Sequence, residues 1–213
     1  MNEKFITFEG GEGAGKTSVI QALAHHFNDI GEKFTTTREP GGIQISESIR
    51  EIILDTNNTV MDARTEALLY AAARRQHLVE KVIPDLKAGK LVLCDRFLDS
   101  SLVYQGIARN IGFDEVYAIN AFAIEDCMPK LTLYFDIEPE KGLLRIAENK
   151  DREINRLDQE NLAFHYRVRE GYLKLLTMFP ERIITIDADR PLKEVVEETK
   201  SKVTGYLNLL RQK

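Results

Sequence analysis

A glycine-rich loop near the start of the chain carries the clearest chemical signal in this sequence. Residues 10–17 match GxxxxGK[ST] in full and lie between an apolar run and an amphipathic segment. Glycines let consecutive backbone N–H groups turn toward one anion, while Lys16 reaches the β- and γ-phosphates and the Thr17 hydroxyl ligates Mg²⁺. The loop predicts a nucleoside triphosphate site formed by Gly10, Gly11, Glu12, Gly13, Ala14, Gly15, Lys16, Thr17 and Ser18.

An acidic residue at the end of an apolar run gives a second signal. Residues 91–94 are all apolar, and Asp95 and Arg96 follow at once. Such a run is typical of a strand covered on both faces, and ligands of open parallel sheets collect at the carboxyl ends of strands. We therefore expect Asp95, Glu9 and the loop to share one crevice. The Asp95 carboxylate suits Mg²⁺ and the Arg96 guanidinium suits a phosphate, although a structural ion pair fits the same two residues.

Further arginines lie close to the predicted strand ends or on helix-period segments. Arg38 follows the second apolar run, and Arg50 lies off a predicted core stripe of Ile45, Ile49, Ile52 and Ile53. Tyr70 and Arg74 are four residues apart, which indicates either a surface cation–π contact or a ring that stacks on a base beside a phosphate-binding guanidinium. On the same segment, the sequence predicts burial of Leu68, Ala72, Val79, Val82 and Leu86.

A polar stripe follows Arg96. Ser101, Gln105 and Arg109 recur every four residues, so on an α-helix they line one face. The carboxamide of Gln105 presents both a donor and an acceptor, as recognition of the N3–H and O4 of a pyrimidine requires. This stripe is a candidate for reading the edge of a base.

Residues 148–158 form a charge-dense interval without an apolar stripe. Charge runs of this kind are usually solvated connections. The interval also contains Arg152 and Arg156, and a segment that closes over a transferred phosphoryl group delivers cations while it excludes water. We therefore expect a mobile lid at about 148–158.

The elements that must position these residues alternate between strands and helices. Helix-period segments separate apolar runs at 4–8, 34–37, 90–94, 131–135 and 182–186. This pattern predicts an α/β fold of the P-loop NTPase type, with a five-stranded parallel sheet and helices on both faces in three layers. The 213 residues and 43% hydrophobic content suit one domain, residues 1–213.

Composition argues against several classes of protein. The net charge of −5 argues against a nonspecific nucleic-acid binder, which needs a basic surface. No apolar run approaches the roughly eighteen residues of a membrane span and no leader is evident, so we expect a cytoplasmic protein without a membrane partner. Cys94 and Cys127 lack a CxxC spacing and are expected to be buried free thiols. The histidines lack metal-ligand spacing, so ordinary structural or surface roles are expected for them.

Beyond these separate signals, the chain resembles the thymidylate kinases, which phosphorylate dTMP to dTDP. The resemblance runs from Phe5 to the C-terminal helix. The glycine-rich loop alone indicates only a P-loop protein, whereas TREPGG together with the block that begins DRF and ends YQG is specific to this family. The matching stretches are FEGGEGAGKT (8–17), TREPGG (37–42), RTEALLYAAARRQH (64–77), CDRFLDSSLVYQG (94–106) and RLDQE (156–160).

This resemblance implies a role for each candidate residue. Lys16 and the loop amides hold the phosphates of ATP, Thr17 and Asp95 serve the magnesium site, and Glu12 accepts a hydrogen bond from the 3′-hydroxyl of dTMP. The family also implies a homodimer. The other residues expected to bind dTMP are Glu39, Arg50, Tyr70, Arg74, Arg96, Ser101 and Gln105.

Members of the family differ in the origin of the catalytic arginine. Some place a basic residue in the phosphate loop, whereas others have a nonbasic loop and supply arginine from the lid. No Arg or Lys lies between Gly10 and Gly15, so the chain resembles the second type, found in bacteria. The catalytic residues expected on this basis are Lys16, Asp95, Arg96, Arg152 and Arg156.

Two other functions remain to be weighed against a dTMP kinase. One is a kinase for another nucleoside monophosphate, because spacing alone does not select thymine, although Gln105 and Tyr70 favour a pyrimidine. The other is a regulatory switch in which the bound triphosphate controls a partner. A GTPase switch would carry NKxD after a strand, and residues 149–151 (Asn-Lys-Asp) lack that spacing. Turnover that depends on a monophosphate acceptor would separate a kinase from a switch.

Overall fold

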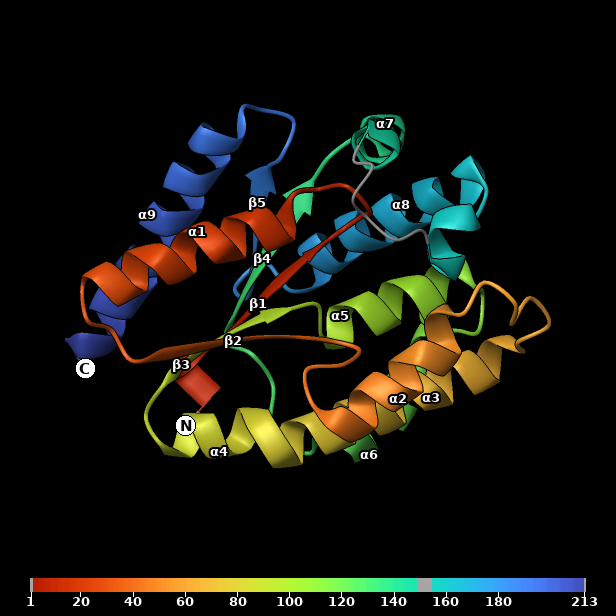
Figure 1. Ribbon diagram of the computed structural model, residues 1–213, viewed down its shortest axis with the longest axis horizontal. Coiled ribbons are helices and arrows are strands. Elements are labelled where there is room, and N and C mark those ends of the chain that lie inside the picture. The colour runs from red at the N-terminus through yellow and green to blue at the C-terminus, as the bar shows by residue number, and fades with distance from the viewer. Residues whose placement is uncertain (1, 149–154, 213) are drawn as a thin grey trace.

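A parallel sheet runs through the centre of the structure (Figure 1). The computed structural model describes residues 2–148 and 155–212 of the chain. Within that part, the five strands lie in the order β2-β3-β1-β4-β5. They are β1 (Phe5–Gly10), β2 (Phe34–Arg38), β3 (Leu91–Asp95), β4 (Leu131–Asp136) and β5 (Ile183–Asp187). Each strand overlaps an apolar run of the sequence, so the predicted five-stranded parallel sheet is confirmed.

The register of the sheet brings its chemically important ends to one edge. Phe8 of β1 pairs with Asp95 of β3, and Arg38 of β2 pairs with the same Asp95. On the other side of β1, Gly10 pairs with Phe135 of β4. The glycine-rich loop, Arg38 and Asp95 therefore leave the sheet at the same edge, as expected where ligands bind in an open parallel sheet.

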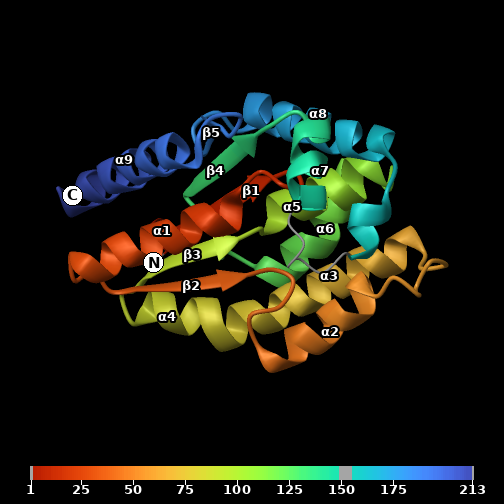
Figure 2. The same ribbon diagram turned by 45° about the horizontal axis from the view of Figure 1, so that its top comes forward.

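Helices cover both faces of the sheet (Figures 1 and 2). On one face, α1 (Lys16–Asp29) and α9 (Leu192–Arg211) pack on a core that includes Ile6, Phe8, Leu23, Leu133 and Val203. On the other face, α8 (Leu162–Met178) and the helical segments after β3 share a core that includes Phe5, Val92, Leu102, Phe164 and Val168. The predicted three-layer arrangement is confirmed.

The remaining helices connect these layers. The α-helices are α2 (Gln44–Leu54), α3 (Ala63–His77), α4 (Ile83–Lys87), α5 (Leu98–Ser101), α6 (Phe113–Ile124) and α7 (Pro139–Glu148). Two segments are π-helical, Leu78–Val82 and Leu102–Ala108, and two are 3₁₀-helical, Asn2–Lys4 and Arg156–Gln159.

Two predicted core stripes are wrong in part. Ile45 and Ile52 of α2 are about half exposed, as are Leu68 of α3 and Val79 just beyond it. Ile53, Val82 and Leu86 are buried as predicted. The inward face of α3 consists of Glu66, Ala67, Ala71, Ala73, Arg74 and His77. The charged members of that face are buried because Glu39, Arg109 and Arg156, on other segments, pair with them, so apolar periodicity pointed to the wrong face of the helix.

The helix type after β3 also differs from expectation. Ser101 ends α5, and the chain continues as a π-helix through Gln105. A π-helix is wider than an α-helix, so Ser101, Gln105 and Arg109 do not form the straight α-helical stripe that their spacing predicted. Ser101 and Gln105 are nevertheless both buried, and each forms a hydrogen bond with a residue on the inward face of α3.

Candidate active site

The phosphate loop joins β1 to α1 at the carboxyl edge of the sheet. Gly13 and Gly15 have φ angles of 70° and 82°, which L side chains rarely adopt. A Cβ at Gly13 would lie 2.0 Å from the carbonyl oxygen of Gly142 in α7. The loop therefore keeps its backbone open at the N-terminus of α1, where N–H groups and the helix dipole attract phosphate.

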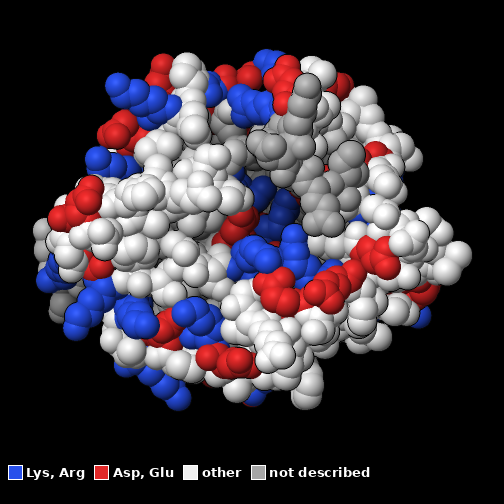
Figure 3. Space-filling model, in the orientation of Figure 1, with Lys and Arg blue, Asp and Glu red and all other residues white. Residues whose placement is uncertain are grey.

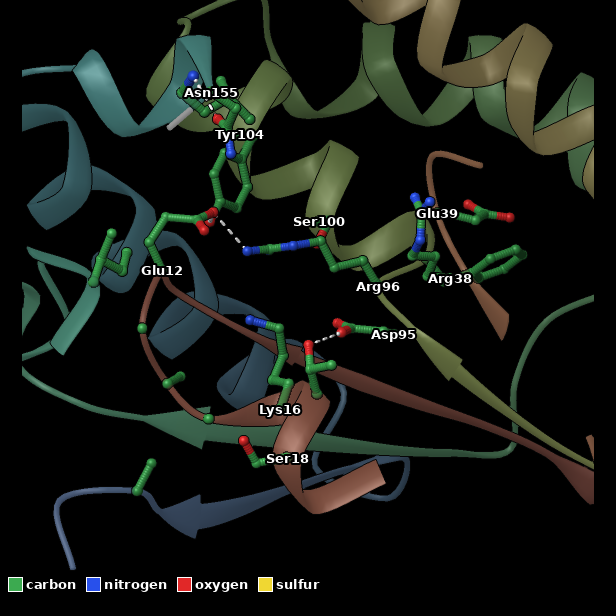
Figure 4. A pocket seen from close by; sticks show the side chains of 18 of the residues that line it. Glu12, Lys16, Ser18, Arg38, Glu39, Asp95, Arg96, Ser100, Tyr104 and Asn155 are labelled. Atoms are coloured by element: carbon green, nitrogen blue, oxygen red, sulfur yellow. Dashed lines mark hydrogen bonds and ion pairs between the residues drawn. The ribbon is translucent and has the colours of Figure 1, made fainter. Parts of the chain in front are cut away.

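Lys16 is the first residue of α1, and its side chain turns back along the loop (Figure 4). The ammonium group donates hydrogen bonds to the carbonyl oxygens of Gly10 (3.1 Å) and Gly11 (3.0 Å). Burial lowers the pKa of Lys16 to about 8, and the positive charge of Arg96 acts in the same direction. Lys16 is therefore still mostly positively charged at neutral pH, and a bound polyphosphate would favour the charged form further.

Thr17 and Asp95 form the candidate metal site. The Thr17 hydroxyl donates to Asp95 Oδ2 at 3.0 Å, whereas Asp95 Oδ1 is buried and has no hydrogen-bond partner among the described residues. Such an acceptor needs a cation or a water. Mg²⁺ is commonly bound by one or two carboxylates, with waters and substrate phosphates completing the shell, and the described residues contain no richer cluster of metal ligands. Thr17 and Asp95 therefore fit Mg²⁺.

Arg96 enters the crevice from a left-handed backbone conformation with φ 67°. Its guanidinium donates to Glu12 Oε1 (2.6 Å) and to the Gly10 carbonyl oxygen (3.0 Å). The guanidinium carbon also lies 5.0 Å from the ring centroid of Tyr104. Figure 4 shows this side chain extended toward Glu12, beyond the end of Lys16. A fixed positive charge thus stands beside the phosphate loop.

Glu9 supports the turn that carries Arg96. Its fully buried carboxylate accepts hydrogen bonds from the Phe97 backbone N–H (2.7 Å), the Ser100 hydroxyl (2.6 Å) and the Tyr172 hydroxyl (2.9 Å). Arg96 Nη1 in turn donates to the Ser100 oxygen at 3.2 Å. Burial raises the pKa of Glu9 to about 7, although the hydrogen bonds oppose this. Glu9 therefore holds the residues that directly follow Arg96 in the turn.

Arg74 lies at the inner wall of the crevice with only 1% of its surface exposed. Its Nε donates to Glu39 at 2.7 Å, and Nη2 donates to the Phe97 carbonyl oxygen at 3.0 Å. Nη1 donates to Ser101 Oγ at 3.0 Å and to Asn120 Oδ1. Most of its N–H groups are thus used inside the protein, and Arg74 is held rigidly at the pocket wall.

His77 completes this buried network. Its Nδ1 lies 2.9 Å from Glu39 Oε1, and its Nε2 lies 2.6 Å from the Thr37 hydroxyl. The imidazole therefore holds the end of β2 against α3. This contact agrees with the expected structural role for the histidine.

Glu66 links the Gln105 side chain to the segment after residue 154. The carboxylate is 1% exposed and accepts hydrogen bonds from Gln105 Nε2 (2.8 Å) and Arg156 Nη2 (2.5 Å). Arg109 Nη2 lies 3.3 Å from it, and Arg156 Nε also donates to the Ile53 carbonyl oxygen at 2.9 Å. Burial raises the pKa of Glu66, but Arg109 and the other donors outweigh burial and hold this pKa below its ordinary value.

One crevice of about 920 Å³ joins these groups. In Figure 3 it is the hollow near the centre of the face, with Lys and Arg side chains inside it and along one rim. Arg38 and Tyr104 also line it, whereas Gly10 and Gly11, the first two residues of the phosphate loop, do not. The predicted residues that line it are Glu12, Gly13, Ala14, Gly15, Lys16, Thr17, Ser18, Glu39, Arg50, Tyr70, Arg74, Asp95, Arg96, Ser101 and Gln105.

Of the two predicted lid arginines, the structure describes only Arg156, which is not among the lining residues. Arg156 begins a short 3₁₀-helix capped by Asn155, and its guanidinium is bound to Glu66 and to Ile53 rather than turned toward Lys16. Arg152 lies outside the described residues. The catalytic roles of both arginines therefore stay predictions.

The sequence reasoning assigned no role to Glu66 or Tyr104, which are central to this site. The Tyr104 hydroxyl donates to Glu12 Oε1 at 3.0 Å, and Glu66 receives Gln105. Glu66 precedes Tyr70 by four residues and Arg74 by eight, so its helical face was a usable signal. Tyr104 is next to Gln105 in the sequence, but it does not belong to the four-residue spacing of Ser101, Gln105 and Arg109, so no pattern identified it.

Comparison with known proteins agrees with this geometry. A family model described as "Thymidylate kinase" matches residues 8–199. A thymidylate kinase of Oceanobacillus iheyensis is 63% identical over 204 residues, which cover 96% of this chain and 91% of that protein. One of Anoxybacillus flavithermus is 61% identical and covers 93% of this chain and 95% of its own. The chain belongs to the thymidylate kinase family.

A solved structure supports the same assignment at the level of the fold. The crystal structure of thymidylate kinase from Ehrlichia chaffeensis aligns with a TM-score of 0.74 at 30% identity, over 93% of this chain and 97% of that chain. As a member of this family, the chain is a kinase enzyme.

Two further expectations concern the cysteines and the possibility of a membrane-spanning helix. Both cysteines, Cys94 and Cys127, are free and buried, as predicted. In the described part of the chain, no helix has the length and apolar character needed to cross a membrane.

Proposed function

We propose that the crevice transfers the γ-phosphoryl group of ATP to the 5′-phosphate of dTMP and so forms dTDP for dTTP synthesis. The observation that carries this proposal is the continuity of the crevice. The phosphate loop, Arg96, and the polar side chains of Arg74 and Gln105 all line the same crevice. Membership of the thymidylate kinase family supports dTMP as the acceptor.

On the donor side, the loop amides and Lys16 bind the β- and γ-phosphates. Thr17 and Asp95 would hold Mg²⁺, which when bound neutralises charge on the phosphates and keeps them in line. The adenine would lie near Arg190 and Pro191, which line the same crevice after β5. Lys16 then stabilises negative charge on the transferred group, because its ammonium is already fixed before the reaction.

On the acceptor side, the residues orient dTMP rather than activate it chemically. The second pKa of a phosphate monoester is about 6, so its attacking oxygen is largely deprotonated at neutral pH and needs no general base. Arg50 and Arg96 offset the repulsion between the phosphates of ATP and dTMP. Glu12 accepts a hydrogen bond from the 3′-hydroxyl of dTMP. Tyr70 stacks on thymine, while Ser101 and Gln105 meet its polar edge.

The lid arginines remain part of the proposal. Arg152 is the stronger candidate to stabilise the transferred phosphoryl group, because Arg156 is engaged by Glu66 and Ile53. An arginine of this kind supplies roughly 10³ to 10⁵ in rate in related phosphoryl transfers. Comparison of kcat for Arg152→Ala and Arg156→Ala tests this assignment, and an equal loss in both would contradict it.

We also propose that the enzyme works as a homodimer. Leu68 of α3 and Val79 of the π-helical segment that follows it are about half exposed, and Phe122 of the neighbouring α6 is 89% exposed. Such a patch is typical of an interface rather than of a solvated face. Light scattering should give a dimer for the native chain and a monomer for the double variant Leu68→Glu/Phe122→Glu. Leu209→Glu, at an exposed position of α9, is the control and should stay dimeric.

The function itself is tested by diphosphate formation from Mg-ATP with dTMP, dUMP, dCMP, AMP and GMP in parallel. We expect strong preference for dTMP and loss of turnover in Arg96→Ala. Preference for another monophosphate would redirect the assignment within the kinases, and absence of turnover with every acceptor would favour a nucleotide-dependent switch. We place this activity in the cytoplasm, where ATP and deoxynucleotides are interconverted.

A further inference from the structure

Gln105 does not have the freedom that an isolated carboxamide has. Its Nε2 donates to Glu66 at 2.8 Å, and both side chains are 1% exposed. No described residue donates a hydrogen bond to Gln105 Oε1, and Gln105 lines the crevice. One end of the amide is therefore tied to the protein, while the other is available to a bound base.

The charge of Glu66 decides which end is tied. Arg156 Nη2 donates to it at 2.5 Å, and Arg109 lies within 3.4 Å of both of its oxygens. These cations, together with Gln105, hold the pKa of Glu66 below its ordinary value although burial raises it. An ionised carboxylate only accepts hydrogen bonds, so the NH₂ group of Gln105 must face Glu66 and the carbonyl oxygen must face away.

The orientation of this amide matters because pyrimidines differ in their polar edges. Thymine has an N–H at position 3 and a carbonyl oxygen at position 4, whereas cytosine has a lone pair at position 3 and an amino group at position 4. A carboxamide that is free to rotate by 180° about its last torsion fits either pattern. One that is fixed fits only one of them.

We infer that Glu66 is a positioning residue that holds Gln105 in the orientation suited to thymine and thereby makes the enzyme discriminate dTMP from dCMP. In this orientation Oε1 accepts the thymine N3–H. Rotation to suit cytosine would turn the carbonyl oxygen of Gln105 toward the Glu66 carboxylate, where two acceptors repel each other. The inference rests on the proposed function, because it assumes that Gln105 meets the base.

The test is the ratio of kcat/KM for dTMP to kcat/KM for dCMP. In Glu66→Gln, a neutral amide at position 66 both donates and accepts, so Gln105 is free to rotate. We expect this ratio to fall about tenfold or more, mainly through better use of dCMP. Calorimetric titration with each monophosphate alone should show the same change in relative Kd without any chemical step.

Two further variants separate positioning from other effects. Arg156→Met removes one cation from Glu66, but Arg109 still contacts both carboxylate oxygens and keeps Glu66 ionised, and the Gln105 contact remains. Its kcat should therefore change equally for both acceptors, and the ratio should hold. Glu66→Asp keeps the charge but is too short to reach Gln105, so its ratio should fall, and it replaces Glu66→Gln if that variant does not fold.

An unchanged ratio in a folded Glu66 variant would overturn the inference, as would an equal fall of the ratio in Arg156→Met. The native enzyme is assayed first in the same experiment. If it fails to phosphorylate dTMP, the proposed function falls, and that outcome is distinct from a failure of the Glu66 variants to change the ratio.

Discussion

The two halves of the crevice are built in opposite ways. The donor half is one continuous loop, from Gly10 to Thr17, which offers backbone N–H groups and a single lysine to its ligand. The acceptor half is assembled from side chains far apart in the chain, such as Glu39, Arg74 and Gln105, and these bind one another. Local sequence is therefore enough to form a phosphate site, whereas a pocket that reads a base depends on the packing of several helices.

The difference also appears in the charges. Most of the N–H groups of Arg74 are used within the protein, while the hydrogen bonds that Lys16 donates to described residues go to carbonyl oxygens of its own loop. Loss of a side chain in the ATP half should therefore mainly lower kcat. Loss of a buried side chain in the dTMP half should mainly lower the free energy of unfolding. The predictions below test this contrast, from the largest expected effect to the smallest.

Replacement of Lys16 should give the largest effect on activity. Lys16→Met removes the preorganised charge on the transferred phosphoryl group, and we expect kcat to fall roughly 10³-fold with little change in Tm. Lys141→Met is the control, because Lys141 is exposed, pairs with Asp189 and does not line the crevice. If Lys16→Met lowered Tm strongly as well as kcat, the loss of activity would reflect a structural role of the donor half.

Removal of Arg74 should give the largest effect on stability. In Arg74→Met, the buried Glu39 carboxylate loses its ion-pair partner, and we expect the free energy of unfolding to drop by about 3 to 5 kcal/mol. The neighbouring Arg75 pairs with Glu125 at the surface, so Arg75→Met should cost less than about 1 kcal/mol. Urea denaturation measures both, and equal losses would remove the distinction between buried and exposed pairs.

The buried Glu9 should make stability depend on pH. Its pKa in the folded protein is about 7 against an ordinary value of 4.5, so between these values the folded state binds more protons than the unfolded state. The stability that Glu9 contributes is thus present below about pH 4.5 and is lost as pH rises through about 7.

Comparison with Glu9→Gln isolates this contribution. The free energy of unfolding of the native chain, minus that of Glu9→Gln, should fall by about 3 kcal/mol across this pH interval. Urea titrations at the two ends of the interval measure the difference. A constant difference would show that Glu9 is not the titrating group.

Substitution of loop glycines should give a smaller effect. Gly13 has φ 70°, and a Cβ there would lie 2.0 Å from the Gly142 carbonyl oxygen, so Gly13→Ala should cost about 2 kcal/mol in stability. Gly11 has open space around it, which makes Gly11→Ala the matched control. Thermal unfolding compares the two, and equal Tm values would show that the loop shifts freely away from α7.

Much of the fold follows from local pattern. All five strands coincide with predicted runs. The inner strands β1, β3 and β4 are apolar along most of their length because both of their faces are covered, whereas the edge strands β2 and β5 are only partly buried. The face of α3 did not follow, because its inward side carries Glu66, Arg74 and His77. Periodicity assumes that charged residues face water, and it fails where charges from distant segments neutralise one another.

The same limit applies to the site. Sequence alone determined the phosphate loop, because its backbone geometry depends on glycines within eight consecutive residues. It also placed Asp95 beside that loop, since parallel strands end at one edge of the sheet. Only the tertiary structure decided that Glu66 ties Gln105 to Arg156, and that Glu9 holds the turn of Arg96. These contacts join residues dozens of positions apart, and their geometry depends on how the helices pack rather than on any local spacing.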